Sequence, residues 1–252
     1  MNRIFLLISA LIFIAPVLSS AEDLTVAVAA DFQYAFEELK SVFETQTGIT
    51  IKDIIGSSGK FVSQIENGAP FDLFLSADVD LPQALYKKGL TCNQPRIYVY
   101  GTLVLWTGRD LDLSQGIEVL KNTAIETIAI PNPQTAPYGR QAVNALKYYK
   151  LYDRIQKKLI FGESIAQVNW FITTQASDIG FTAKSIVLSP HMKTKGTWME
   201  IDKIAYEPMA QGAVILKYAE SSHLSAAQKF FEFLFSKEAR DIYEEYGYIV
   251  PN

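Results

Sequence analysis

The alternation of strand-like and helix-like segments is the feature that most constrains how this chain folds. Apolar runs rich in β-branched residues alternate with stretches in which apolar residues recur at helical spacing. Strands separated by helices of this length predict βαβ units and mainly parallel sheets. We expect strands over 23–30, 49–56, 71–77, 124–133, 157–164 and 207–216. Helices are expected over 32–48, 60–68, 80–90, 138–151, 165–175 and, as one helix or two, 225–247. The segment 176–187 predicts a strand followed by a short helix.

The segment 96–108 indicates how these units divide into lobes. It is long for a single strand and contains Gly101. We therefore expect it to leave a first sheet and enter a second, and we expect 207–216 to be the return path. Two α/β lobes joined by two crossing segments fit this order. A single larger sheet is the alternative that the pattern leaves open.

The first 21 residues have the organisation of a signal peptide. Arg3 is followed by an apolar run, 4–18, and then by the small residues Ser19, Ser20 and Ala21. The apolar run is shorter than the roughly 20 residues that a transmembrane helix needs, although an uncleaved anchor is the alternative. We expect residues 1–21 to be removed and the mature chain to reside in the periplasm.

Composition and charge exclude several classes of function. The net charge is −4 without a Lys/Arg cluster, which argues against a nucleic-acid partner. The single cysteine, Cys92, excludes a disulfide framework, and with only His191 and His223 beside it the chain is poorly supplied with metal ligands. The small acidic group of Asp72, Asp78 and Asp80 is interpreted as capping and turn residues, with a metal site as the less favoured alternative.

The sequence offers little for catalysis. It contains no G-x-S-x-G nucleophile elbow, and Cys92 has no neighbouring histidine. We therefore expect no catalytic residues and no enzymatic activity.

Four strand-to-helix junctions are candidates for ligand binding: "AADF" (29–32), "GSSGKF" (56–61), "TAPYGRQA" (135–142) and "GESIAQ" (162–167). In open α/β sheets ligands bind beyond the C-terminal ends of strands, where the following helices begin. A helix N-terminus presents unpaired N–H groups and a partial positive charge, so several together can bind an anion without Lys or Arg. For "GSSGKF" and "TAPYG" the alternative is an ordinary helix start, with Ser58 as a simple N-cap.

Several motifs in order along the chain resemble the periplasmic molybdate-binding proteins of ABC importers. They are "TVAVAADF", "GSSGKFVSQIENGAPFDLFLSAD", "GTLVLW", "NPQTAPYGRQAV", "GESIAQ" and "SKEARDIYEEYGY". The resemblance implies an α/β fold of the two-lobed periplasmic binding protein type (type II), with lobe 1 formed by 22–101 plus 208–252 and lobe 2 by 102–207. It also implies a monomer that holds molybdate or tungstate between its lobes, uses no cofactor and delivers the anion to a membrane permease.

The resemblance also implies which residues bind the oxyanion. The matching positions here are Ala30, Asp31, Ser57, Ser58, Tyr138 and Ile165. Ser58 would offer a hydroxyl and an N–H group, whereas Tyr138 and Ile165 would offer backbone N–H groups. Hydrogen-bond donors would hold the anion, and no direct protein ligand to the metal is expected, with Asp31 as the possible exception.

Two positions depart from the family pattern. Asp31 stands where Ser, Thr or Asn is usual, and Ala183 stands where many members have a tyrosine hydroxyl, which Tyr138 or Thr182 would have to replace. Four interpretations of Asp31 remain open, in order of preference. It caps the following helix; it is protonated and donates to the anion; it accepts from a protonated oxyanion such as phosphate or arsenate; or it ligates the metal directly.

Three rival functions remain at this point. The chain could bind another oxyanion or an organic acid, it could be the effector part of a transcription regulator, or it could be an exported hydrolase. The signal sequence and the lack of a helix-turn-helix segment argue against the regulator.

Overall fold

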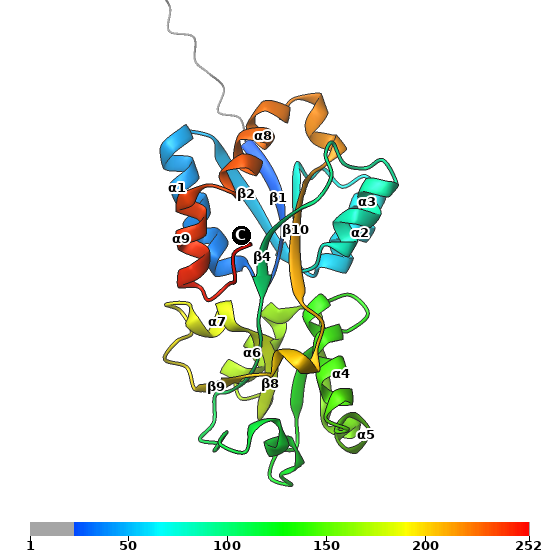
Figure 1. Cartoon of the computed structure of the whole chain (residues 1–252), viewed down its shortest axis with the longest axis vertical. Helices are drawn as coiled ribbons and strands as arrows, with labels where there is room; N and C mark the ends of the chain where they lie inside the picture. The colour runs from blue at the N-terminus through cyan, green and yellow to red at the C-terminus, as the bar shows by residue number, and fades with distance from the viewer. Residues whose placement is uncertain (1–22, 252) are drawn as a thin grey trace, which may run out of the picture.

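A computed structural model describes residues 23–251 of the chain. The predicted signal peptide, 1–21, lies outside the described residues. Within 23–251, no helix has both the length and the apolar character that crossing a membrane requires. Figure 1 shows two lobes stacked along the long axis of the molecule, each with a central sheet and flanking helices.

The first lobe contains a five-stranded sheet with the order β2-β1-β3-β10-β4. Its strands are β1 (Asp23–Ala29), β2 (Thr50–Gly56), β3 (Leu73–Ser76), β4 (Arg96–Gly101) and β10 (Met209–Ile215). Its helices are α1 (Gln33–Thr47), α2 (Ser58–Glu66), α3 (Asp80–Lys87), α8 (Leu224–Phe233) and α9 (Lys237–Glu245). Strand β1 pairs in parallel with β2 and β3, whereas β10 is antiparallel to β3 and β4.

The second lobe repeats this arrangement with the strand order β7-β6-β8-β5-β9. Its strands are β5 (Leu103–Thr107), β6 (Ile128–Pro131), β7 (Leu159–Gly162), β8 (Ile179–Ala183) and β9 (Thr197–Glu200). Its helices are α4 (Pro137–Tyr148), α5 (Tyr152–Ile155), α6 (Ile165–Thr173) and α7 (Lys184–Leu188). The 3₁₀ helices within residues 23–251 are η1 (Gly116–Lys121), η2 (Gln156–Lys158), η3 (Lys203–Ala205) and η4 (Lys217–Ser221).

The crossing between lobes occurs as the sequence predicts. Strand β4 ends at Gly101 in the first sheet and β5 begins at Leu103 in the second, and β10 brings the chain back. The alternative of one larger sheet is wrong. The exact limits of the lobes, predicted at 101/102 and 207/208, stay a prediction. The last segment of the chain returns to the first lobe, where Ile249 forms an isolated β-bridge with Tyr100 of β4.

Alternating side chains of β1 explain how the first sheet is covered on both faces. Val26 and Val28 pack into a large core with α1, α8 and α9. Ala27, between them, faces a smaller core built with Phe61 of α2 and Leu85 of α3. The period of two along the strand thus buries both faces, as expected for a parallel strand with helices on either side.

The structure differs from the sequence expectations in three local features. Each sheet is evenly mixed, with antiparallel pairs on one side, because β10 and β5 run against their neighbours. The short strand β9 was not predicted, and helix α2 begins at Ser58 rather than at residue 60. The closing segment forms the second of its two expected alternatives, two helices, and the Ser236 hydroxyl between them caps α9.

Candidate oxyanion-binding site

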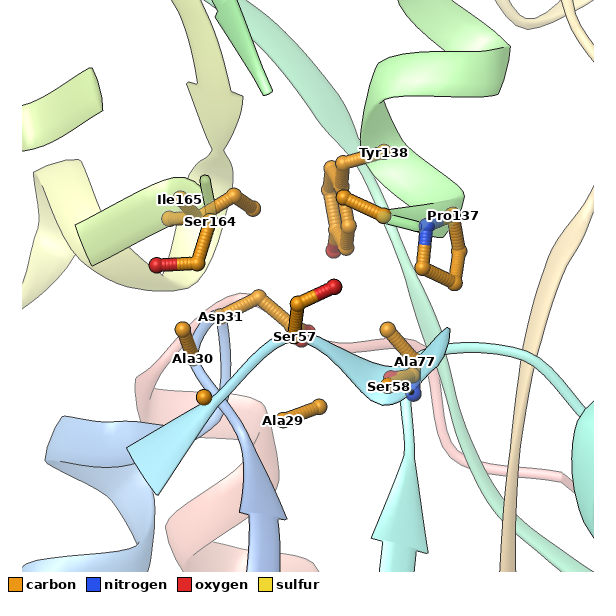
Figure 2. A pocket seen from close by; sticks show the side chains of 12 residues that line it. Ala29, Ala30, Asp31, Ser57, Ser58, Ala77, Pro137, Tyr138, Ser164 and Ile165 are labelled. Atoms are coloured by element: carbon orange, nitrogen blue, oxygen red, sulfur yellow. Dashed lines mark hydrogen bonds between the residues drawn. The ribbon is translucent and has the colours of Figure 1, made fainter. Parts of the chain in front are cut away.

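A small cavity lies between the two lobes, where three helices begin. Helix α2 of the first lobe and α4 and α6 of the second start at its wall, and the turn that precedes α1 lines it as well. The residues that line it are Ala29, Ala30, Asp31, Gly56, Ser57, Ser58, Ala77, Ala136, Pro137, Tyr138, Ser164 and Ile165 (Figure 2). All six predicted site residues are therefore brought to one cavity. None of the lining residues is Lys, Arg or His.

The helix starts supply backbone donors to this cavity. Ser58 is the first residue of α2, Ile165 is the first of α6, and Tyr138 is the second of α4 after Pro137. N–H groups in the first turn of a helix have no carbonyl one turn earlier to bond to, and they carry the positive end of the helix dipole. A cavity lined in this way attracts an anion without a counter-charge.

The Ser58 hydroxyl is oriented to donate. Its oxygen accepts a hydrogen bond from the N–H group of Ala77 at 3.0 Å, and the side chain is fully buried. A hydroxyl has one proton and can accept as well as donate. Since the Ala77 N–H occupies an acceptor position, the hydroxyl proton of Ser58 can point to a bound oxygen.

The Ser57 hydroxyl, which was expected to bind the oxyanion, contacts the other lobe instead. It donates to the carbonyl oxygen of Thr135, in the second lobe, at 2.6 Å. The N–H group of Gly59 donates to the same carbonyl at 2.8 Å. Ser57 thus joins the lobes with its side chain, and only its backbone can serve a ligand.

Ala30 contributes a wall rather than a donor. Its N–H group donates to the carbonyl oxygen of Gly56 at 2.9 Å, so that donor is already paired. Its methyl group, with those of Ala29 and Ala77, keeps this part of the cavity narrow.

Ser164 is a lining residue that sequence reasoning missed. It precedes α6 with an extended backbone, but its side chain makes no capping hydrogen bond. Figure 2 shows it beside Ile165 on the second-lobe side of the cavity. The signal was available, because a serine immediately before a helix start in "GESIAQ" has the same position as Ser57 before α2.

The Asp31 carboxylate is buried in a network that joins both lobes. One of its oxygens, Oδ2, accepts from Gln211 Nε2 at 2.5 Å and lies 3.4 Å from the Tyr248 hydroxyl. Its backbone carbonyl accepts from Tyr248 at 2.9 Å and from Ser185 of the second lobe at 2.8 Å. The preferred interpretation, a helix cap, is wrong, because α1 begins after Phe32 without a side-chain capping bond.

Burial also changes the acidity of Asp31. Loss of hydration raises the pKa of its carboxyl group from 3.8 to about 6, although hydrogen bonds from Gln211, from its own backbone N–H group and from Tyr248 and Tyr138 oppose the rise. An ionised carboxylate only accepts hydrogen bonds. At 4 Å from an anion it would be repelled by about 1–4 kcal/mol for each negative charge at effective dielectric constants of 80 to 20.

Of the two residues suggested to replace the tyrosine hydroxyl of the family at Ala183, only Tyr138 lies at the cavity. Thr182 donates to Asn169 Oδ1 at 2.6 Å and does not line the cavity. The ring of Tyr138 is buried at the cavity wall, and its hydroxyl lies 3.5 Å from Gln211 Nε2. Burial and the nearby Asp31 carboxylate hold the pKa of Tyr138 well above 10, so this hydroxyl keeps its proton.

Contacts around the cavity show that the lobes are closed. Arg140 of α4 pairs with Asp78 of the first lobe, and Lys60 of α2 pairs with Glu163 at 2.5 Å. On the side of α1, the rings of Tyr34 and His191 stack with their centres 5.0 Å apart. Ligands would reach the cavity only when these contacts open.

The capping role expected of the acidic group near β3 is confirmed for Asp78, which accepts from the N–H group of Leu81 at the start of α3. Asp72 has a different role, because it accepts from the N–H group of Thr25 in β1 at 2.7 Å and pairs with His223. Across residues 23–251, no group of three or more His, Cys, Asp or Glu side chains is placed to hold a metal ion.

Two α/β lobes that cross over twice and close on a cavity lined by helix starts define a solute-binding protein of the two-lobed class. Comparison with known proteins agrees with this assignment. The chain belongs to the family of bacterial extracellular solute-binding proteins, which matches residues 24–249.

Within this family the chain is similar to molybdate-binding proteins. It is 38% identical to the molybdate-binding protein ModA of Azotobacter vinelandii over 91% of each chain. It is 34% identical to ModA of Rhodobacter capsulatus, over 92% of this chain and 90% of the relative. The solved structure of the A. vinelandii periplasmic molybdate-binding protein superimposes with a TM-score of 0.86 and 33% identity, covering 91% of this chain and 100% of that one. The predicted resemblance and fold class are confirmed.

Proposed function

We propose that the protein captures molybdate in the cavity between its lobes and delivers it to the membrane permease of an ABC importer. The observation that carries the proposal is the convergence of three helix starts and the Ser58 hydroxyl on a closed cavity with no cationic side chain. The relatives named for molybdate binding share this chain's full folded length. The expected location of this function is the periplasm.

Capture would begin on the first lobe. The Ser58 hydroxyl and N–H group, with the N–H group of Asp31, would hold the anion in the open form. Closure would then add the N–H groups of Tyr138 and Ile165 and the hydroxyl of Ser164. An anion of the right size places an oxygen opposite each of these donors, so every donor is hydrogen-bonded. A smaller anion would leave some of the donors buried and unpaired.

This geometry also supports tungstate as a second ligand, since it is a tetrahedral dianion like molybdate. It disfavours sulfate, which is smaller. It disfavours hydrogen phosphate when Asp31 is protonated, because the proton of that anion then meets no acceptor. Binding would require no cofactor and no catalytic residue, and we expect a monomer.

The test is thermal unfolding of the mature protein at pH 7 with millimolar molybdate, tungstate, sulfate, hydrogen phosphate or arsenate. A ligand present at 1,000 times its Kd adds about 4 kcal/mol to the free energy of unfolding. We expect a large increase in Tm with molybdate and tungstate and a small one with the others. An increase with phosphate or arsenate, and none with molybdate, would contradict the proposed ligand.

A further inference from the structure

We propose that binding of the oxyanion is coupled to uptake of one proton by the carboxylate of Asp31. A proton from the solvent adds to one carboxylate oxygen, the side chain becomes neutral, and its new O–H group donates a hydrogen bond within the site. This inference rests on the proposed oxyanion-binding function and adds the charge state in which that function operates.

The position of Asp31 is the first argument. Its side chain is 2% exposed and lines the same closed cavity as the helix starts of α2, α4 and α6. The other groups assigned to the anion are N–H and hydroxyl donors. Among them, an ionised Asp31 carboxylate would be the one acceptor that a bound dianion meets. Protonation turns this acceptor into a donor and removes the like charge.

The surroundings of Asp31 offer no other way to neutralise it. The groups that face it are the Gln211 amide of β10 and the hydroxyl groups of Tyr98 on β4, Tyr138 on α4 and Tyr248 after α9. These groups are uncharged, because burial and the nearby carboxylate hold the pKa of all three tyrosines well above 10. Ser185 of α7 contacts only the backbone carbonyl.

Charged side chains near the cavity are already engaged elsewhere. Arg140, in the helix that carries Tyr138, pairs with Asp78, and Lys60, in the helix that carries Ser58, pairs with Glu163. Neither cation lines the cavity. A solvent proton is therefore the available source of positive charge.

The acidity of Asp31 is consistent with this step. Burial raises its pKa to about 6 against the opposing hydrogen bonds, before any anion is present. A dianion in the cavity adds like charge and raises the pKa further, past neutral pH. At pH 7 the Asp31 carboxyl group would therefore be ionised in most molecules of the free protein and protonated in the complex.

The coupling predicts how affinity depends on pH. Above the pKa of Asp31 in the free protein, the Kd for molybdate should rise about tenfold for each pH unit, because less of the protein carries the proton. Asp31→Asn places a permanent neutral donor at the same position, so its Kd should not change with pH.

Isothermal titration calorimetry with molybdate at pH 7 tests the proposal. Titrations in buffers of different ionisation enthalpy give the number of protons taken up. We expect about one for the native protein and for the control Asp80→Asn, an exposed carboxyl group, and about zero for Asp31→Asn. Zero for the native protein with molybdate still bound would overturn the proposal and leave the function intact. Absence of molybdate binding by the native protein would instead refute the function, and the coupling with it.

A second measurement does not depend on folding of the variant. The Kd of the native protein for molybdate, measured between pH 6 and 8, should rise steadily with pH. A constant Kd over this range would also overturn the proton uptake.

Discussion

At the scale of single residues, the buried Asp31 carboxylate lowers the free energy of unfolding of the ligand-free protein, and this effect can be measured. Its raised pKa means that the folded state holds a proton between about pH 4 and 6 that the unfolded state has already released. The free energy of unfolding must therefore fall as pH rises through this window. Because one pH unit corresponds to about 1.4 kcal/mol, the ionised buried carboxylate costs about 3 kcal/mol at pH 7.

The first prediction follows from this cost. Without ligand, Asp31→Asn should unfold with a free energy about 3 kcal/mol higher than the native protein at pH 7, and the difference should vanish toward pH 4. The asparagine oxygen can still accept from Gln211, so the network is kept. Urea unfolding at the two pH values measures the effect. A variant that is less stable at pH 7 would show that the ionised carboxylate stabilises the fold.

The second prediction concerns Ser58. Ser58→Ala removes a buried donor to the anion and leaves the Ala77 N–H group without its acceptor. Hydrogen bonds to charged groups contribute about 1.5–3 kcal/mol, so the Kd for molybdate should rise roughly 10- to 100-fold. Ser63→Ala, on the exposed side of the same helix, is the matched control and should bind normally. Equal affinities for both variants would remove Ser58 from the site.

Individual contributions to the site were only partly visible in the sequence. The strand-to-helix junctions pointed to these segments, the family resemblance pointed to Ser58, Tyr138 and Ile165 within them, and all three lie at the cavity. The direction of each hydroxyl was not predictable, because it depends on partners far along the chain. Ser57 turns to Thr135, 78 residues away, and Asp31 meets Tyr248, 217 residues away.

At the scale of elements, α2 combines the site with the contact between lobes. Its first turn supplies Ser58 to the cavity, and its Gly59 N–H group bonds to the Thr135 carbonyl of the second lobe. A Cβ atom at position 59 would lie 2.6 Å from that carbonyl oxygen, which leaves no room for a side chain in the closed form.

The third prediction is that Gly59→Ala uncouples folding from binding. Alanine is more favourable than glycine in a helix by about 0.5–1 kcal/mol, so the ligand-free protein should be as stable as the native one or slightly more so. The Kd for molybdate should nevertheless rise about tenfold or more, because closure meets the added methyl group. Gln64→Ala, exposed on the same helix, serves as the control. Normal binding by Gly59→Ala would mean that closure does not require this contact.

Most elements could be predicted because their apolar spacing is regular. Residues 32–48 and 138–151 show helical periodicity, and Gly101 marked the change of sheet. Strand β9 was missed because its four residues, two exposed and two half-buried at a sheet edge, carry no clear alternation. The orientation of β10 and β5 was missed because pairing direction depends on topology rather than on local pattern.

At the scale of the whole molecule, two ion pairs and the Ser57–Thr135 hydrogen bond join the lobes around the cavity. Arg140 and Asp78 form the more buried of the two ion pairs across the cavity, and Lys60 and Glu163 form the more exposed one. Exposed ion pairs contribute little to stability, whereas ion pairs that lose water when the lobes close slow the opening of the lobes.

The fourth prediction is that the Arg140–Asp78 pair slows ligand release. Replacing either residue by alanine should raise the rate of molybdate release several-fold, and a double-mutant cycle should give a coupling energy of about 1 kcal/mol. Stopped-flow measurement of release provides the rates. The exposed Lys237–Asp241 pair on α9 is the control, and its removal should leave release unchanged. A coupling energy near zero would mean that the ion pair does not hold the lobes together.

The central claim is that the cavity between the lobes holds a tetrahedral oxyanion by neutral donors. The most direct test is a crystal structure grown with molybdate and measured at the molybdenum absorption edge. We predict one strong anomalous peak in the cavity, with oxygens in contact with Ser58, Tyr138, Ser164 and Ile165 and with no Lys or Arg side chain beside it. An empty cavity, or a peak held by cationic side chains elsewhere, would contradict the account.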